Sequence, residues 1–258
     1  MRTTTTRGEL SRRFQSLITG YSELRTNETA RLTRVLDGLL PGFLAERKKW
    51  AEVQRKSADD FNLFQVMGLE GDEVCHSTLL AWLLAHRIER GTHAQGNLGF
   101  RLFLEELSRE LQKQEGVDVT VYADADYWVD CEVRGHEARV DIEIAAQAKF
   151  LIHIENKIYS AEGNDQTNRE WRDLEVRRKG LAVPENQCHA LFLTLDGTNA
   201  QNDQFRPIRW GRIARILGKF ADRAEPPEVK LFAGHYARAI RKLSAIERAE
   251  MEADDADI

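Results

Sequence analysis

The stretch RVDIEIAAQAKFLIHIENKIYSAEGNDQ, residues 139–166, decides the fold of this chain. Val140, Ile142 and Ile144 alternate with charged residues, and the same alternation returns after a short segment at residues 145–149. Side chains of a β-strand point to opposite faces in turn, so the pattern predicts two strands that form a hairpin. Each strand then has one apolar face and one charged face.

The charged faces place acidic side chains close together. If the hairpin folds about Gln147, Asp141 lies opposite His153 and diagonal to Glu155, within about 5–8 Å at Cβ. Lys157, two residues further on, points to the same place. Two carboxylates can share Mg²⁺, which prefers oxygen ligands and keeps waters. The pattern therefore suits phosphodiester hydrolysis, in which a metal activates water and a lysine stabilises charge or orients that water.

The alternative for this pattern is a solvated hairpin face with an exposed salt bridge. The neighbours of Glu155 argue against it, because residues 150–152, Ile154 and Ile158 are apolar and indicate a central, buried strand. Charged groups in such strands are rarely left unpaired.

At these residues the sequence resembles the PD-(D/E)XK nuclease superfamily. Asp141 occupies the motif aspartate, Glu155 the acidic position, Asn156 the variable position and Lys157 the lysine, while Val140 replaces the proline of the motif name. The resemblance implies a restriction-endonuclease-like α/β fold, with a mixed β-sheet flanked by helices. It also implies a Mg²⁺ site, with Mn²⁺ as a substitute, formed by Asp141, Glu155 and the backbone carbonyl of Asn156, with Lys157 as a catalytic residue.

The resemblance extends over roughly residues 59–245, to a branch with further motifs in a fixed order. These motifs are Asn62-Leu63-Phe64, the E-x-x-H-S block from Glu73 to Leu84, the strand Ile154–Ile158, Gln166, and the strand Leu193–Gly197. The branch implies that Glu73 is a third metal-site carboxylate and that Gln166 lies near the attacking water or scissile phosphate. One departure is Trp171, five residues after Gln166, where a tyrosine at four is expected.

The residues alone leave other roles open for the motif side chains. Glu73 can be a helix-start carboxylate favoured by the helix dipole. Gln166 can be an ordinary exposed amide in a helix predicted over residues 161–179. His76 is either a satisfied core histidine or a residue that supports the site. A di-iron site is excluded, because no second E-x-x-H occurs in the chain.

Charge is unevenly distributed along the 258 residues. The net charge of −5 arises in residues 247–258, which carry six acids and one base, whereas the other 246 residues carry 36 acids and 36 bases. We expect a disordered acidic tail at 247–258, a helical extension at 1–57 and a nuclease-like domain at 58–246. A neutral body can carry a basic groove but should not coat DNA indiscriminately.

Compartment is indicated by the cysteines and by the hydropathy of the chain. Cys75, Cys131 and Cys188 are odd in number and far apart, without a CxxC pattern, which favours reduced thiols in a cytoplasmic protein. We expect no signal peptide and no membrane-spanning segment, because no apolar run approaches about 20 residues.

The remaining pattern predicts helices at both ends of the motif region. Residues 8–56 read as helical, with breaks near Thr19–Gly20 and at Pro41–Gly42 and a possible cap at Thr26 or Asn27. A short helix capped by Asp59-Asp60 stops at Gly68, and further helices are predicted at 72–87, 98–114, 208–222 and 229–245. Strands are predicted at 117–122, 127–133 and 189–195, the last parallel to the Lys157 strand through a crossover.

Basic side chains on the later helices are candidates for phosphate contacts. Each group alone is equally well explained as a solvated helix face, but together they favour a basic cleft. The nucleic-acid-binding candidates are Arg169, Arg172, Arg212, Arg215, Lys219 and Arg238.

The preferred interpretation is a Mg²⁺-dependent endonuclease that acts on DNA rather than RNA. A role in phage defence or restriction follows only from the resemblance. The alternatives are a non-catalytic nucleic-acid-binding or assembly module on the same fold, and an RNase. The N-terminal helices are a candidate surface for homo-oligomers.

Overall fold

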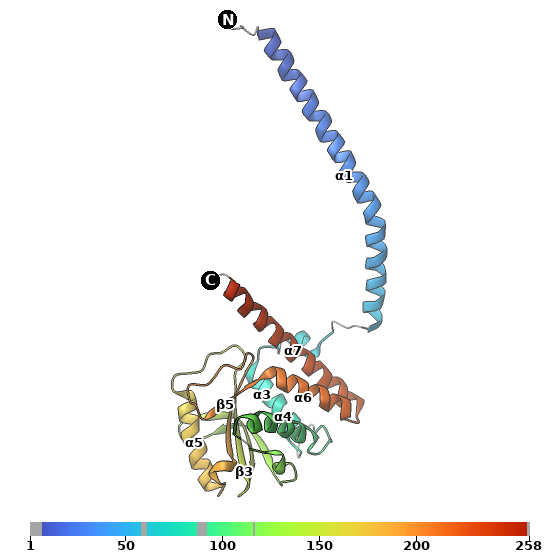
Figure 1. The fold of residues 1–258 in the computed structure, drawn as a ribbon. Coiled ribbons are helices and arrows are strands. Elements are labelled where there is room, and N and C mark those ends of the chain that lie inside the picture. The colour runs from blue at the N-terminus through green and yellow to red at the C-terminus, as the bar shows by residue number, and fades with distance from the viewer. Residues whose placement is uncertain (1–6, 58–60, 87–91, 116, 257–258) are drawn as a thin grey trace. The chain divides into compact units, whose positions relative to one another are not determined.

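The computed structural model describes residues 7–57, 61–86, 92–115 and 117–256, drawn in colour in Figure 1. The chain divides into two compact units, Met1–Phe61 and Asn62–Ile258. None of the described helices is long and apolar enough to cross a membrane.

The first unit is one helix, α1 (Arg7–Ser57), of 51 residues. The predicted breaks are wrong, because the helix continues through Gly20, Pro41 and Gly42. Thr26 does not cap a helix, because its hydroxyl donates a hydrogen bond to the carbonyl of Ser22, four residues earlier. Three other threonines of α1 donate in the same way to the carbonyl four residues before them. Threonines in helix interiors satisfy their hydroxyls in this way.

The second unit is built on a five-stranded sheet of order β1-β2-β3-β4-β5. Its strands are β1 (Trp128–Arg134), β2 (Arg139–Ala146), β3 (Phe150–Asn156), β4 (Cys188–Thr194) and β5 (Phe205–Arg209). The first three strands pair antiparallel, whereas β3–β4 and β4–β5 pair in parallel. The mixed restriction-endonuclease-like sheet and the parallel crossover to β4 are therefore confirmed.

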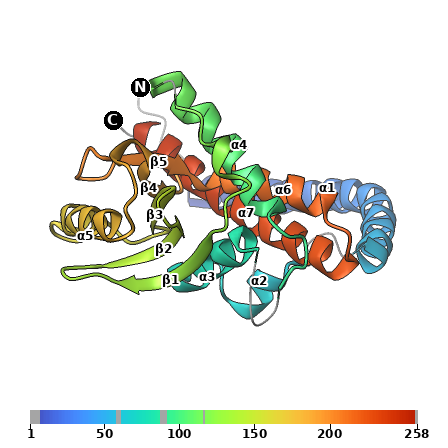
Figure 2. The same cartoon turned by 90° about the horizontal axis from the view of Figure 1, so that it is seen from below.

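Helices cover both faces of this sheet, as Figure 2 shows. On one face α5 (Gln166–Gly180) packs through Leu174 against Leu151 and Phe192. On the other face lie α3 (Glu73–Leu84), α4 (Leu98–Glu115), α6 (Trp210–Arg223) and α7 (Pro227–Ala256), which share the larger core with the isoleucines of β2 and β3. Every residue of β3 is buried, so the charged face of this strand is inside the protein.

The hairpin of β2 and β3 differs from the prediction in register. Ala146 pairs with Phe150 and Glu143 with His153, so the hairpin turns about Ala148 and not about Gln147. Ala148 has a left-handed φ of 57°, and its amide donates to the carbonyl of Leu181 after α5. Continuing this register by one residue places Asp141 opposite Glu155, which is closer than the predicted diagonal.

Several local predictions are confirmed. The short helix α2 (Leu63–Met67) ends at Gly68, whose φ of 68° is left-handed. Its N-terminal cap is Asn62, while the predicted cap at Asp59-Asp60 lies outside the described residues. Asp72 caps α3 by accepting a hydrogen bond from the Cys75 amide.

Other boundaries differ from the prediction. Residues 117–122 do not form a strand but end in a 3-10 turn, Thr120–Tyr122, and a second 3-10 turn, Glu185–Gln187, precedes β4. Strand β5 was not predicted. The acidic segment expected to be disordered continues α7 as far as Ala256.

The two edges of the sheet are β1 and β5. Strand β5 carries Pro207, which pairs with Phe192 of β4, and β1 carries Asp130 and Glu132. Proline within a sheet is confined to edge strands, because it has no amide hydrogen to donate.

The close contact of α3 and α4 gives a test of the fold. A Cβ at Gly99 would collide with the backbone carbonyl of Leu83, so Gly99→Ala forces the two helices apart. We expect a loss of about 1–3 kcal/mol in the free energy of unfolding, measured by urea denaturation. Gly234→Ala in α7 is the control: a Cβ there meets no atom within 4 Å, and alanine should stabilise that helix by up to about 1 kcal/mol. Equal effects of the two substitutions would contradict the close packing.

Candidate active site

Strands β2 and β3 bring the two predicted metal-site carboxylates to the end of the hairpin. Asp141 lies in β2, and its Oδ2 accepts a hydrogen bond of 2.8 Å from the backbone amide of Asn156. Glu155 lies in β3 and is only 1% exposed. The hydrogen bond fixes the Asp141 carboxylate beside the backbone of the strand that carries Glu155.

Lys157 and Gln166 both contact the same oxygen of Glu155. The Lys157 ammonium is 2.8 Å from Glu155 Oε1, and the Gln166 side-chain amide donates a short hydrogen bond to this oxygen. Gln166 is the first residue of α5, not one or two turns inside the helix as predicted. Its amide also donates to Glu170 Oε1, at 2.9 Å.

Glu170 is a site residue that the sequence analysis missed. It lies four residues after Gln166, where the family resemblance leads one to expect a tyrosine, and it is 2% exposed. Helical spacing of four places the two side chains on one face of α5. This spacing was the signal available in the sequence.

The carboxylates of this cluster repel one another and are buried. Burial, then the charges of Glu170 and Asp141, raise the pKa of Glu155 above its ordinary value. Burial is also the main cause that raises the pKa values of Glu170 and Asp141. Burial lowers the pKa of Lys157, but Glu155, Glu73 and Asp141 outweigh it and raise that pKa overall. The raised pKa values mean that these carboxyl groups tend to keep protons, and a bound cation would displace those protons and stabilise the charged forms.

Glu73 lies near the carboxylate cluster, and its own carboxylate accepts several hydrogen bonds from the turn after β3. Its Oε1 accepts hydrogen bonds from the amides of Ile158 and Ser160, at 2.8 and 3.2 Å, and both oxygens contact the Ser160 hydroxyl. Burial raises the pKa of Glu73, but these hydrogen bonds outweigh it and lower the pKa. Glu73 therefore holds the turn after β3, close enough to Lys157 and Asp141 for its charge to raise the pKa values of both.

Asn156 joins four elements at the end of β3. Its side-chain amide donates to the Glu73 carbonyl and to the Ser77 hydroxyl of α3, at 3.0 and 3.1 Å. Its side-chain oxygen accepts from the indole of Trp210 in α6, at 3.0 Å. Together with the amide bonded to Asp141, these contacts fix the strand end between Glu155 and Lys157.

His76 is a core histidine with both ring nitrogens satisfied. Nδ1 lies 2.9 Å from the Tyr236 hydroxyl and Nε2 lies 2.7 Å from the Glu70 carbonyl. Burial lowers the pKa of His76. It supports the start of α3, on which Glu73 lies.

The donor atoms of the site fit a hard divalent cation. Glu155 Oε2 and Glu170 Oε2 are buried and have no hydrogen-bond partner. Within the described residues no group of three or more His, Cys, Asp or Glu is arranged to hold a metal ion. Mg²⁺ needs fewer, because it is usually bound by one or two carboxylates and keeps several waters.

The basic candidates do not line one cleft around the carboxylates. Arg169 and Arg172 lie on α5, whereas Arg212, Arg215 and Lys219 lie on α6, which covers the opposite face of the sheet. Lys219 is 2.8 Å and Arg215 3.6 Å from the carboxylate of Glu106 in α4. These two side chains thus pair within the protein.

The other candidates have varied surroundings. Arg172 pairs with Glu137 at 2.7 Å, and the Arg169 guanidinium donates to the carbonyl of Asn164. Arg238 is exposed on α7.

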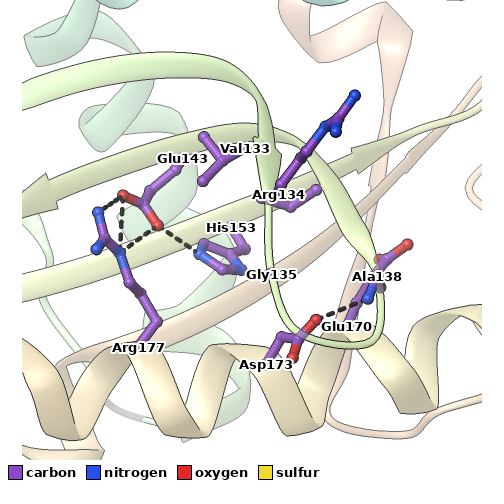
Figure 3. Close-up of a pocket in the computed structure, with 10 residues that line it drawn as sticks. Val133, Arg134, Gly135, Ala138, Glu143, His153, Glu170, Asp173 and Arg177 are labelled. Carbon is purple, nitrogen blue, oxygen red and sulfur yellow. Dashed lines mark hydrogen bonds and ion pairs between the residues drawn. The ribbon is translucent and has the colours of Figure 1, made fainter.

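A pocket next to the site contains a second buried charge network, shown in Figure 3. Glu143 Oε2 is 3.1 Å from His153 Nε2, and its carboxylate accepts from Arg177 of α5 at 2.7–3.2 Å. Asp173 of α5 accepts hydrogen bonds from the backbone amides of residues 136–138. These hydrogen bonds connect helix α5 to β2 and the β1–β2 turn, and they set the position of Gln166 and Glu170 on that helix.

A mixed sheet with an acidic hairpin face under a helix defines a restriction-endonuclease-like fold. The family model described as the PD-(D/E)XK nuclease superfamily matches residues 61–250. The chain belongs to this superfamily, whose members are typically nucleases and usually use divalent metals such as Mg²⁺. Neither the curated proteins nor the solved structures contain a match.

The Glu143 network predicts a dependence of stability on pH. Burial raises the pKa of Glu143, but hydrogen bonds from His153 and Arg177 outweigh it and lower the pKa to about 2. The unfolded value is about 4.3. A lowered folded pKa stabilises the protein above about pH 4.3, and this contribution is lost as the pH falls toward about 2.

Glu143→Gln should therefore destabilise the protein at pH 7 and have less effect at pH 3. We expect a cost of about 3 kcal/mol at pH 7, the lower end for breaking a buried pair, because Arg177 is half-exposed. Urea denaturation at both pH values measures it. Glu46→Gln, in an exposed pair with Lys49, should change stability by less than about 1 kcal/mol. A cost for Glu143→Gln that is the same at both pH values would contradict this account.

Proposed function

We propose that this chain is a Mg²⁺-dependent endonuclease that hydrolyses phosphodiester bonds of DNA, with Mn²⁺ as a substitute. The observation that carries the proposal is the buried Glu155 carboxylate, which has one oxygen on Lys157 and Gln166 and the other without a partner, beside Asp141. A cluster of like charges is costly to bury, so its retention favours a bound cation over a purely structural role.

In this proposal Asp141, Glu155 and the backbone carbonyl of Asn156 hold the cation. When bound, the cation would lower the pKa of a water and neutralise charge on the phosphate. Gln166 and Lys157 fix one oxygen of Glu155, which orients the other. Glu73 orders the turn of residues 158–160 and so limits where the Lys157 side chain can lie.

Lys157 has the second chemical role. Its ammonium lies at the carboxylate cluster and is partly exposed, with 13% of the side chain accessible. A fixed positive charge beside a phosphate stabilises the negative charge that develops when the bond breaks. Lys157 can also orient the attacking water.

DNA is our preferred substrate, and Arg169, Arg172 and Arg238 are the proposed phosphate contacts. Arg212, Arg215 and Lys219 were candidates as well. The ion pairs with Glu106 favour a structural role for Arg215 and Lys219. We also propose that the protein acts in the cytoplasm, which is supported by three cysteines without disulfides, and in restriction or phage defence, for which the family is the support.

The direct test is incubation of the full chain with supercoiled, linear and single-stranded DNA and with RNA. Each substrate is tested with Mg²⁺, with Mn²⁺ and with EDTA. Cleavage of DNA that requires the metal supports the proposal, and cleavage of RNA alone would make the protein an RNase. Binding without cleavage in either metal would favour a non-catalytic module.

Lys157→Ala separates the enzyme from a binding module. Because a charge-stabilising group acts mainly in the transition state, the cleavage rate should fall by about 10²-fold or more. DNA affinity, measured by fluorescence anisotropy, should stay within a fewfold. The control is Lys149→Ala, an exposed lysine in the β2–β3 turn, which should cleave like the wild type. Equal cleavage by the two variants would remove Lys157 from the mechanism.

We further divide the chain by role, with residues 58–246 as the nuclease domain and residues 1–57 as an extension that pairs with a second copy. Helix α1 has large hydrophobic side chains that are 49–71% exposed. Many recur after 18 residues, which is five turns of an α-helix, so they form one straight stripe. The stripe consists of four series of residues spaced by 18: Phe14, Leu32 and Trp50; Leu17, Val35 and Val53; Ile18 and Leu36; Tyr21 and Leu39.

The area of this stripe is enough for a stable dimer. Aromatic side chains alone bury about 150–250 Å² each, and the stripe has three of them besides its aliphatic residues. A standard interface buries about 1,200–2,000 Å² in total from both partners. A second copy of α1 supplies a matching stripe of the same length.

The helix pairing is tested by charge on the stripe. We expect the full chain to be dimeric by sedimentation, and Leu36→Glu with Leu39→Glu to be monomeric, because paired carboxylates would be buried there. The control, Asn27→Glu with Ala30→Glu, adds the same charge on the opposite face and should stay dimeric. A monomeric wild type would refute this proposal without affecting the nuclease assignment.

A further inference from the structure

Glu170 is a buried carboxyl group that forms no ion pair of its own among the described residues. Its Oε1 accepts one hydrogen bond, from Gln166, and its Oε2 is buried without a partner. A buried charged group with an unsatisfied oxygen is costly, and a single glutamine in its place would avoid the cost. The position therefore needs an explanation beyond packing.

The arrangement of Gln166 shows how Glu170 is related to the proposed active site. The side-chain amide of glutamine has two donors, and here they go to Glu155 Oε1 and Glu170 Oε1. One amide thus holds the two carboxylates side by side by one oxygen each. The other oxygen of each, Glu155 Oε2 and Glu170 Oε2, is buried and receives no hydrogen bond from another side chain or the backbone, and the two carboxyl groups lie within hydrogen-bonding reach of each other.

The positive charge near these groups is insufficient. In the described part of the chain, Lys157 is the side chain that forms an ion pair with the cluster, and it contacts Glu155 Oε1, the oxygen that already accepts from Gln166. Three carboxylates, of Asp141, Glu155 and Glu170, therefore share one ammonium group. The two unpartnered oxygens are of the type that hard divalent cations prefer.

We propose that Glu170 and Glu155 bind a cation as a two-carboxylate pair through these second oxygens, next to Asp141. This inference rests on the proposed function for the identity of the site, and it concerns a residue of α5 rather than the motif strands. Two carboxylates are enough for Mg²⁺ or Mn²⁺, which keep several waters.

Space for these waters lies beside Glu170. Glu170 lines a cavity of about 120 Å³ together with His153, Arg177 and residues of the β1–β2 turn (Figure 3). This volume is well above the minimum that a water molecule needs, so the cavity can hold ordered water. His153 Nδ1, which is also buried without a partner, offers this water a polar contact.

The test compares cation binding by the wild type and by Glu170→Gln, which keeps the size of the side chain and removes its charge. Binding of Mg²⁺ and Mn²⁺ is measured by calorimetry on the full chain, and the melting temperature is recorded with and without each cation. We expect affinity to fall by about 10-fold or more. The rise in melting temperature caused by the cation should shrink accordingly. Without cation, the variant should melt at the same temperature as the wild type or higher, because a buried repulsion is removed.

Glu175→Gln is the matched control, since Glu175 lies on the same helix and pairs with Arg178. It should keep the cation affinity of the wild type whatever its effect on the melting temperature. If Glu170→Gln lowers the melting temperature without cation and leaves cation affinity unchanged, Glu170 has only a structural role and the inference fails.

The outcomes distinguish this inference from the nuclease proposal. Metal-dependent cleavage by a wild type whose cation affinity does not depend on Glu170 would overturn the inference alone. Cation binding that depends on Glu170, in a protein that cleaves no nucleic acid, would overturn the nuclease proposal alone. A wild type that binds neither Mg²⁺ nor Mn²⁺ would overturn both.

Discussion

The hydrogen bonds of Asn156 are the constraint on which the rest of the second unit depends. Its backbone amide holds Asp141, while its side chain is directed to the opposite face of the sheet and reaches α3 and α6. Neighbouring residues of a strand point to opposite faces. Asn156 can therefore anchor the strand end in one layer while Glu155 and Lys157 face the other layer.

This anchoring makes an otherwise unfavourable cluster possible. Asp141, Glu155 and Glu170 repel one another in a buried place, and a loose strand end would let them separate. Instead Asn156 holds the hairpin from one face, and helix α5 holds it from the other through Arg177 and Gln166. The packing of both layers therefore maintains the geometry of the charges.

Much of the fold could be predicted because its signals are local. Alternation gave β2 and β3, and the helix between β3 and β4 implied the parallel pairing. The predicted register of the β2–β3 hairpin was wrong because the turn depends on Ala148. A left-handed φ is not expected of alanine, and here it is supported by the hydrogen bond from the Ala148 amide to the Leu181 carbonyl. Strand β5 was missed because Pro207 argues against a strand.

The residues of the candidate site likewise fall into those that could be predicted from the sequence and those that could not. The motif residues Asp141, Glu155 and Lys157 could be found from parity and resemblance. The roles of the Asn156 side chain and of Glu170 could not, because they depend on which helices pack against each face of the sheet. The order of the motifs suggested that Glu73 lies near the site, but its hydrogen bonds to residues 158–160 depend on a turn that the sequence does not specify.

Pro207 in β5 also affects how this protein behaves when it is concentrated. An exposed sheet edge is a template on which a strand of another molecule can add, and this is a common route to aggregation. Pro207 has no amide hydrogen to donate on one edge, and β1 at the other edge carries the charged residues Asp130 and Glu132, of which Glu132 pairs with Arg139. Addition of a strand from another molecule is thus disfavoured at both edges of the sheet.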